Sequence, residues 1–304
     1  MEIYNQITII GLGLIGSSLA RGIKDKELTE KLVGFDINPD YQKQILDLNL
    51  VDVLCDKITD AVKDADLVIL ATPVGTYAEI GKEIADHLKE GATLSDVGSV
   101  KSSVLASLED IVPEHVHLIP AHPVAGTEQS GPDAGFASLF HDRWAIITPP
   151  KGADENAVKM LETLWKELGS NIEIMDADHH DRVLAITSHI PHLIAYNIVS
   201  TARDLEDVTK SEVIKFSAGG FRDFTRIAAS DPTMWRDVFL NNKDAVLEML
   251  GRFSEDLTAL QRAIRWGDGD QLFELFEKTR RIRRQIIDAG QDEDAPDFGR
   301  HHDD

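Results

Sequence analysis

Short apolar runs alternate with amphipathic segments over the first half of the chain. The segment 154–168 is typical, because Leu161, Leu164 and Leu168 recur at the three- and four-residue spacing of a helix. Strand and helix patterns that alternate in this way favour a parallel, doubly wound sheet. The runs that we predict to be strands are ITIIG (7–11), LVGFD (32–36), DLVILATP (66–73), ATLSDVG (92–98), HLIPAHP (117–123), WAIITPP (144–150) and NIEIM (171–175).

Long helical patterns replace the strands after about residue 176. Three of them cover 178–203, 243–268 and 270–288. Thr233–Asp244 adds a further helix, which starts after the break at Asp231-Pro232. The second half of the chain is therefore predicted to be helical.

These patterns divide the chain into three parts. We expect an α/β domain over residues 1–175 and an all-helical domain over residues 176–290. Residues 291–304 have the acidic composition of a disordered tail. Long apolar helices commonly pack against a symmetry mate, so the helical domain is expected to form a homodimer.

Composition and charge narrow the class of partner. The chain has 31 Lys and Arg against 53 Asp and Glu, a formal net charge of −22 that repels DNA and anionic membranes. No apolar run approaches the roughly 20 residues of a membrane span, and the N-terminus lacks the basic region of a signal peptide. Cys55 is the only cysteine, which excludes an internal disulfide. We expect a cytoplasmic protein that binds neither nucleic acid nor membrane.

A glycine-rich turn, GLGLIG, follows the first strand and opens a helix. Gly11 permits a tight turn, Gly13 lets a diphosphate approach the backbone, and Gly16 lets the helix pack close to the strand. Asp36 ends the second strand, where it can bond a ribose hydroxyl and repel a 2′-phosphate, so NAD is favoured over NADP. The alternative is a glycine turn beside a solvated aspartate. The predicted NAD contacts are Gly11, Leu12, Gly13, Leu14, Ile15, Gly16, Asp36, Thr72 and Pro73.

Three unusual segments follow strand ends, where ligands of open α/β sheets bind. They are ATPV (71–74), SDVGSVKSS (95–103) and AHPVAGTEQSG (121–131). His122 of the third segment can take a proton from a substrate hydroxyl, and Ser99 of the second can orient either group. Alternatively, His122 only bonds a carbonyl in a buried turn. Lys101 is interpreted as a surface charge at a helix start.

The helical half contributes histidines. His189 and His192 in TSHIPH share one helix face, and a pocket lining suits them better than a zinc site because no cysteine or HExxH pattern accompanies them. No metal is expected. His179 and His180 lie among acids near a helix start, and we interpret both as solvated.

The segment SAGGFRDFTRIAASDPTMWRD (217–237) adds cations. Arg226 can hold a substrate carboxylate bidentately, whereas Arg222 fits an ordinary salt bridge on the helix. An anionic substrate needs such a local cation in a chain this acidic. Trp235 fits the core, or a wall of the pocket.

Taken in order, these motifs resemble the prephenate/arogenate (cyclohexadienyl) dehydrogenases of tyrosine biosynthesis. The resemblance covers about residues 7–290 and rests on GLGLIG, FD, ATPV, DVGSVK, HPVAGTEQSG, TSHIPH and GGFRDFTRIAASDPTMWRD. It implies a Rossmann-type NAD-binding domain followed by a helical dimerisation domain.

The resemblance also implies an oxidative decarboxylation of prephenate to 4-hydroxyphenylpyruvate. His122 would draw the proton of the ring hydroxyl while a hydride passes to NAD, and Ser99 would position both. Arg226 would clamp a carboxylate, although the sequence leaves open which one. His192 would contact the substrate side chain, Thr127 and Glu128 belong to the loop over the site, and Glu128 and Asp223 would act at its entrance.

Other functions fit parts of the pattern. Prephenate is favoured, with arogenate accepted as well; an arogenate-specific enzyme is the main alternative. A β-hydroxyacid or imine dehydrogenase would use a lysine of the helical half, but no motif surrounds Lys210, Lys215 or Lys243. A non-catalytic NAD sensor would be expected to lack His122 or Arg226, and both are present.

Overall fold

A computed structural model describes residues 3–204 and 215–288. The expected tail at 291–304 and Lys210 lie outside these ranges. The chain forms two compact units, Met1–Leu247 and Glu248–Asp304. The first unit contains both the sheet and the first helices of the second half, so the elements of the candidate site belong to one unit.

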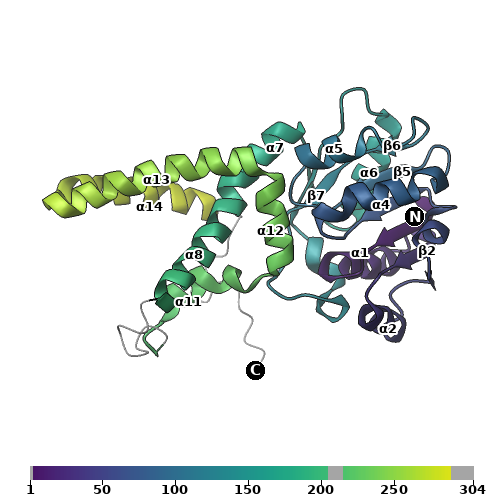
Figure 1. Cartoon of the computed structure of the whole chain (residues 1–304), viewed down its shortest axis with the longest axis horizontal. Helices are drawn as coiled ribbons and strands as arrows, with labels where there is room; N and C mark the ends of the chain where they lie inside the picture. The colour runs from purple at the N-terminus through teal and green to yellow at the C-terminus, as the bar shows by residue number, and fades with distance from the viewer. Residues whose placement is uncertain (1–2, 205–214, 289–304) are drawn as a thin grey trace. The chain divides into compact units, whose positions relative to one another are not determined.

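Six parallel strands form the main sheet of the first unit (Figure 1). Their order is β3-β2-β1-β4-β5-β6, which is the Rossmann order and confirms the predicted doubly wound sheet. The two-residue β3 was not predicted, because so short a strand leaves no hydrophobic period. The strands are β1 (Tyr4–Ile10), β2 (Thr29–Phe35), β3 (Val53–Leu54), β4 (Leu67–Leu70), β5 (Thr93–Asp96) and β6 (His117–Leu118).

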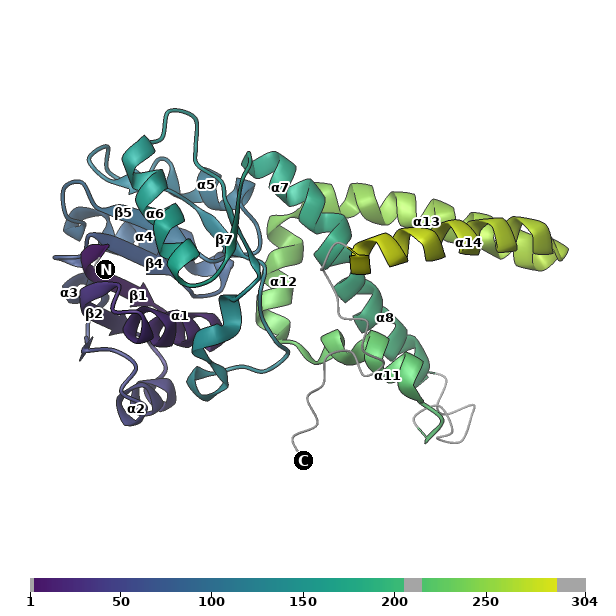
Figure 2. The same ribbon diagram turned by 180° about the vertical axis from the view of Figure 1, so that it is seen from behind.

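Helices cover both faces of this sheet and bury two apolar cores. Figure 1 shows α4 and α5 on one face, and Figure 2 shows α6 on the other. The core under α1 and α6 includes Leu19 and Trp165, and the core under α4 and α5 includes Ile84 and Val104. The helices are α1 (Leu14–Asp25), α2 (Pro39–Asp47), α3 (Ile58–Val62), α4 (Tyr77–Ile84), α5 (Ser102–Leu108) and α6 (Glu155–Glu167).

The run HLIPAHP does not form the single strand that we predicted. Leu118 pairs with Leu94 in the main sheet, whereas Ala121 pairs with Ile147 in a second sheet. Pro120 separates the two pairings because it has no N–H to donate to a ladder. The second sheet has the order β7-β8-β9, with β7 (Ala121–Pro123) antiparallel to β8 (Trp144–Ile147) and β8 parallel to β9 (Asn171–Ile174).

Beyond residue 176 the described chain holds only helices and turns, as predicted. The expected helix over 178–203 is interrupted, because a π-helical turn, η5 (Ala185–His189), separates α7 (Ala177–Leu184) from α8 (Ile190–Asp204). The remaining helices are α11 (Gly219–Thr225), the 3₁₀ turn η6 (Arg226–Ala229), α12 (Pro232–Asn241), α13 (Lys243–Trp266) and α14 (Gly269–Asp288).

Local signals fix where several of these helices begin and end. The Asp231 side chain accepts a hydrogen bond from Met234 N, and Pro232 occupies the first turn of α12. Gly267, at φ 70°, makes the turn between α13 and α14, which run side by side in Figures 1 and 2. The break at Asp231-Pro232 was therefore interpreted correctly.

One helical stretch in the described residues, Ala177–Asp204, is long and apolar enough to cross a membrane by length and composition. We had expected no such run. A helix that packs in a protein core passes the same criterion. In this case the stretch includes His180, Asp181 and His189, which are buried in the first unit.

Lys101 is buried, which corrects its interpretation as a surface charge. Its side chain is 0% exposed, and its Nζ lies 2.5 Å from Asp96 Oδ2 and 2.7 Å from the carbonyl oxygen of Ala121. Asp96 also accepts hydrogen bonds from Gly98 N and Ala121 N. The ion pair therefore ties the end of β5 to β7.

We predict that Lys101→Met strongly destabilises the protein. The substitution leaves the Asp96 carboxylate buried without its counterion, which costs about 3–5 kcal/mol. The midpoint of urea unfolding should fall accordingly. Lys166→Met is the matched control, because Lys166 pairs with Glu162 at the exposed surface of α6 and such pairs contribute about 0.5 kcal/mol or less. Equal shifts in the two variants would contradict the prediction.

Candidate active site

The glycine loop after β1 has the tight geometry that the motif predicts. Gly11 has φ 88°, and a Cβ at this position would lie 2.7 Å from Thr72 Cγ2. A Cβ on Gly16 would lie 2.0 Å from the carbonyl oxygen of Gly11, so the start of α1 packs directly on the turn. At Gly13, by contrast, no described residue apart from its neighbours in the chain has an atom within 4 Å of the Cβ position. The loop thus leaves open space at the position where a phosphate would approach.

The N-terminus of α1 is suited to an anion. Its cap residue, Gly13, has no side chain that could cap the helix, and the first turn contains no acidic residue. Leu14 and Ile15 in this turn are half-buried. Unpaired N–H groups at a helix start favour a negative charge, so a dinucleotide diphosphate fits here.

Asp36 lies beside the glycine loop and is largely buried. Its Oδ2 accepts a hydrogen bond from Leu12 N at 2.8 Å, and its Oδ1 accepts one from Asn38 N at 2.9 Å. These bonds hold the carboxylate in place next to the turn. Thr72 and Pro73 follow β4, and Thr72 contacts Gly11. The predicted cofactor residues therefore surround the end of β1 and the neighbouring loop after β4.

A cavity of about 530 Å³ brings most of the predicted catalytic and substrate residues together. Its walls come from β7 and the loops after β5 and β7, together with η5, α8, η6 and α12. Asp223 is not among its lining residues. Those that we predicted are Ser99, His122, Thr127, Glu128, His192, Arg226 and Trp235.

His122 lies within β7 with its ring buried. Its Nδ1 is 2.8 Å from Nε2 of His180, which leaves Nε2 of His122 as the ring nitrogen without a partner in the described residues. Burial lowers the pKa of His122 well below 6.5, and the neighbouring His180, Lys101 and His189 lower it further. The imidazole is therefore neutral at neutral pH and able to accept a proton.

His180 is buried rather than solvated, which overturns our interpretation. Its Nδ1 lies 2.8 Å from Oδ1 of Asp181, and its side chain is 0% exposed. His179, the adjacent residue, is exposed as expected. Consecutive residues of α7 point about 100° apart, but which of the two positions faces the fold depends on His122, which lies 58 residues earlier in the chain.

Charged groups also line the cavity. Arg226 Nη1 lies 2.6 Å from Glu128 Oε2, with side-chain exposures of 51% and 33%. Arg222 Nε lies 3.5 Å from Asp223 Oδ1. Arg222 is outside the cavity, as we expected of an arginine that forms an ordinary salt bridge on its helix. Arg143, the residue before β8, also lines the cavity and was missed, because no motif surrounds it in the sequence.

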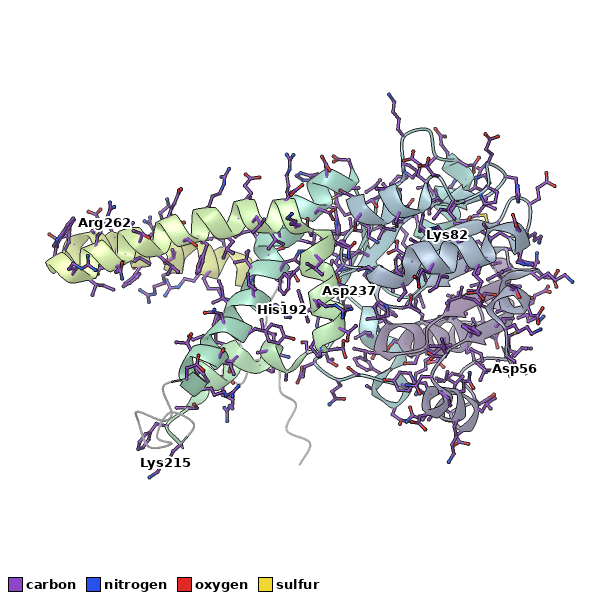
Figure 3. The ribbon with its side chains drawn as sticks, in the orientation of Figure 1. Asp56, Lys82, His192, Lys215, Asp237 and Arg262 are labelled. Atoms are coloured by element: carbon purple, nitrogen blue, oxygen red, sulfur yellow. The ribbon has the colours of Figure 1, made fainter. Side chains whose placement is uncertain are left out.

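Aromatic stacking orients the histidines of the helical half. The ring of His192 stacks on Trp235 with a centroid distance of 3.6 Å, and Figure 3 shows His192 between α8 and α12. His192 Nδ1 donates to the carbonyl oxygen of Ser188, so in the neutral ring Nε2 is the nitrogen that can accept a hydrogen bond. His189 is buried, bonds Asn242 at 3.0 Å, and does not line the cavity. Trp235 thus serves both as core and as cavity wall.

Comparison with known proteins assigns both halves of the chain. Residues 19–174 match the family model for the prephenate dehydrogenase nucleotide-binding domain, and residues 176–278 match that for the prephenate dehydrogenase dimerization domain. Cyclohexadienyl dehydrogenase from Zymomonas mobilis is 43% identical over 93% of this chain and 96% of its own length. Prephenate dehydrogenase from Bacillus subtilis is 33% identical over 93% of this chain and 76% of its own.

A solved structure agrees with these matches. Prephenate dehydrogenase from Aquifex aeolicus, in complex with hydroxyphenyl propionate and NAD+, superimposes with a TM-score of 0.86 at 34% identity. The alignment covers 94% of this chain and 98% of that one. The family expected from the ordered motifs is confirmed, as is the Rossmann-type domain followed by a helical domain. The chain belongs to the prephenate dehydrogenase family.

Proposed function

We propose that this chain is an NAD-dependent prephenate dehydrogenase that decarboxylates prephenate oxidatively to 4-hydroxyphenylpyruvate and also accepts arogenate. The observation that carries the proposal is that His122, Ser99 and Arg226 line one cavity, together with His192. A base and a cation at one cavity suit an anionic substrate that loses a proton. The relatives named cyclohexadienyl and prephenate dehydrogenase support the same assignment.

The cofactor proposal rests on the loop around β1. Gly11 to Gly16 would hold the diphosphate at the start of α1, and Asp36 would bond the ribose. Thr72 and Pro73 would border the same cofactor. NAD+, when bound, accepts the hydride from the substrate ring.

His122 is the proposed base. Its Nε2 would take the proton of the ring hydroxyl, and Ser99 would hold that hydroxyl in line. Loss of the ring carboxylate as carbon dioxide makes the ring aromatic, so the step is downhill. The protein therefore needs to supply orientation and one proton acceptor.

Arg226 is the proposed carboxylate clamp. Its guanidinium already pairs with a carboxylate, that of Glu128, and a substrate carboxylate could replace it. Binding the leaving carboxylate tightly would stabilise the ground state, so we assign Arg226 to the carboxylate of the side chain. Thr127 and Glu128 would border the entrance, with Asp223 further out. His192 and Trp235 would contact the side chain.

The alternatives differ in substrate. An arogenate-specific enzyme would need an acidic partner for the substrate ammonium, and Glu128 is the lining residue that fits. A β-hydroxyacid or imine dehydrogenase would need a lysine in the cavity, and within the described residues none lines it. The lack of such a lysine argues against the second alternative, and Glu128 is the reason that arogenate is expected to be accepted as well as prephenate.

The remaining assignments concern assembly and location. We propose a domain boundary near residues 175–176, with NAD bound by residues 1–175 and dimerisation through residues 176–290. Exposed apolar side chains on α13 and α14, such as Trp266 and Phe273, support a homodimer. The acidic charge and the biosynthetic relatives support a cytoplasmic enzyme without nucleic-acid or membrane partners.

The first test follows NADH formation at 340 nm with prephenate and, separately, with arogenate. Turnover is expected with prephenate, and absence of turnover with both substrates would remove the assignment.

His122→Asn should lower kcat by about 10²- to 10⁴-fold with little change in substrate binding, because it removes the proton acceptor. Normal turnover in this variant would identify another residue as the base.

The pH dependence of kcat/KM tests the protonation state of His122. The base acts when neutral, and burial lowers its pKa well below 6.5. The rate should therefore stay constant through neutral pH and fall only as the pH drops below 6.5. His180, Lys101 and His189 face the ring, and each shifts the pKa in the same direction. A half-maximal rate at pH 7 or above would contradict this assignment.

The proposed clamp predicts a selective effect on binding. Arg226→Gln should raise KM by about 10-fold or more with a smaller change in kcat, because a charge-assisted pair contributes about 1.5–3 kcal/mol. Arg222→Gln is the matched control, since Arg222 is an exposed arginine one turn away and outside the cavity. Similar KM values for the two variants would remove Arg226 from substrate binding.

A further inference from the structure

Three buried polar side chains form a row behind the cavity. His122 of β7 bonds His180 of α7, with 2.8 Å between His122 Nδ1 and His180 Nε2. His180 in turn bonds Asp181, with 2.8 Å between His180 Nδ1 and Asp181 Oδ1. The three residues are 6%, 0% and 4% exposed. The row is therefore shielded from water and joins the cavity to the start of α7.

The Asp181 carboxylate determines which atom donates in each hydrogen bond of this row. Its Oδ1 accepts a hydrogen bond from Lys101 N at 2.8 Å, and its Oδ2 accepts one from Ser102 N at 2.9 Å. These bonds, together with His180, lower the pKa of Asp181 despite its burial. The group is thus an anion that only accepts hydrogen bonds.

The proton positions follow by elimination. Because Asp181 only accepts, Nδ1 of His180 must carry a hydrogen. Burial lowers the pKa of His180, so the ring is neutral and its Nε2 has a lone pair. The nitrogen facing it, Nδ1 of His122, must then carry a hydrogen. Neutral His122 is left with its lone pair on Nε2, which is the nitrogen that the proposed chemistry requires.

We propose that His180 and Asp181 are positioning residues that hold His122 in the tautomer with its hydrogen on Nδ1. This inference rests on the proposed function, in which His122 is the base. When the substrate O–H bond breaks, an N–H bond forms at Nε2 of His122, and the new positive charge is stabilised through His180 by the Asp181 anion. No proton leaves the row in this step.

A purely structural role for His180 makes different predictions. If the ring only filled space, an apolar side chain of similar size would preserve turnover, and the tautomer of His122 would not depend on residue 180. If the row sets the tautomer, an acceptor must be present at this position. Leucine and glutamine separate these cases, because only the amide oxygen of glutamine can accept the hydrogen of His122 Nδ1.

The kinetic test compares three variants of the full-length protein. His180→Leu should lower kcat by about 10- to 100-fold while KM changes less than about twofold, since orientation is lost but not the cavity. His180→Gln should recover a large part of kcat. His179→Leu is the matched control, because His179 is the exposed neighbour, and it should leave both constants unchanged. Full kcat in His180→Leu would overturn the proposal.

A second measurement does not depend on turnover, and the tautomer is measured in the wild-type protein. Long-range ¹H–¹⁵N spectra of histidine-labelled wild-type protein report which ring nitrogen carries the hydrogen, and the signals of His122 are assigned by their loss in His122→Asn. The expected result is a hydrogen on Nδ1. A hydrogen on Nε2 would overturn the proposal even if the variants behaved as expected.

The two measurements also separate this inference from the proposed function. If His122→Asn kept normal turnover, the assignment of the base would fail while the tautomer remained measurable. If His122→Asn were inactive but the wild-type spectrum showed a hydrogen on Nε2, the base would stand and the positioning role would fail.

Discussion

The Asp181 carboxylate is the point at which the helical half of the first unit is fixed to the nucleotide-binding fold. It accepts hydrogen bonds from the N–H groups of Lys101 and Ser102 at the start of α5. Its Oδ1, which accepts the bond from Lys101 N, also accepts one from His180 Nδ1. The carbonyl oxygen of Asp181 also accepts a hydrogen bond from Asn242 near the end of α12. One buried residue therefore relates α5, α7 and α12, and the cavity is lined by Ser99 in the loop before α5 and by Met234 and Trp235 of α12.

The buried pair Lys101–Asp96 lies directly beside this junction. The Lys101 ammonium balances the Asp96 carboxylate at the end of β5. Its second hydrogen bond, to Ala121 O, holds the strand that carries His122. The cost of burying these charges is compensated only while all partners remain in place. The position of the proposed base is consequently coupled to the stability of the fold.

What the sequence could predict was local. The glycine turn, most strands and the start of α12 depend on residues within a few positions of one another and were located correctly, and Asp36 was located by its regular spacing after the glycine turn. The burial of Lys101 and His180 could not be predicted, because it comes from partners far along the chain: His122 lies 58 residues before His180, and Lys101 lies 80 residues before Asp181. A histidine among acids looks solvated until the surface that covers it is known. The division of HLIPAHP at Pro120 was visible as a proline within an apolar run, but the second sheet that receives Ala121 was not.

The π-helical turn Ala185–His189 has a consequence for how tolerant this helix is to changes in length. A π turn places one more residue in a turn than an α-helix does, and each residue of an α-helix rotates the chain by about 100°. Deleting a single residue here would allow regular winding and would leave the later side chains of α8 near their present faces, whereas deleting one residue of α7 would swing every side chain of α8 round the axis by that angle. His192 would then leave the face of Trp235, so the irregular turn is the part of this helix in which the loss of one residue keeps the two rings stacked.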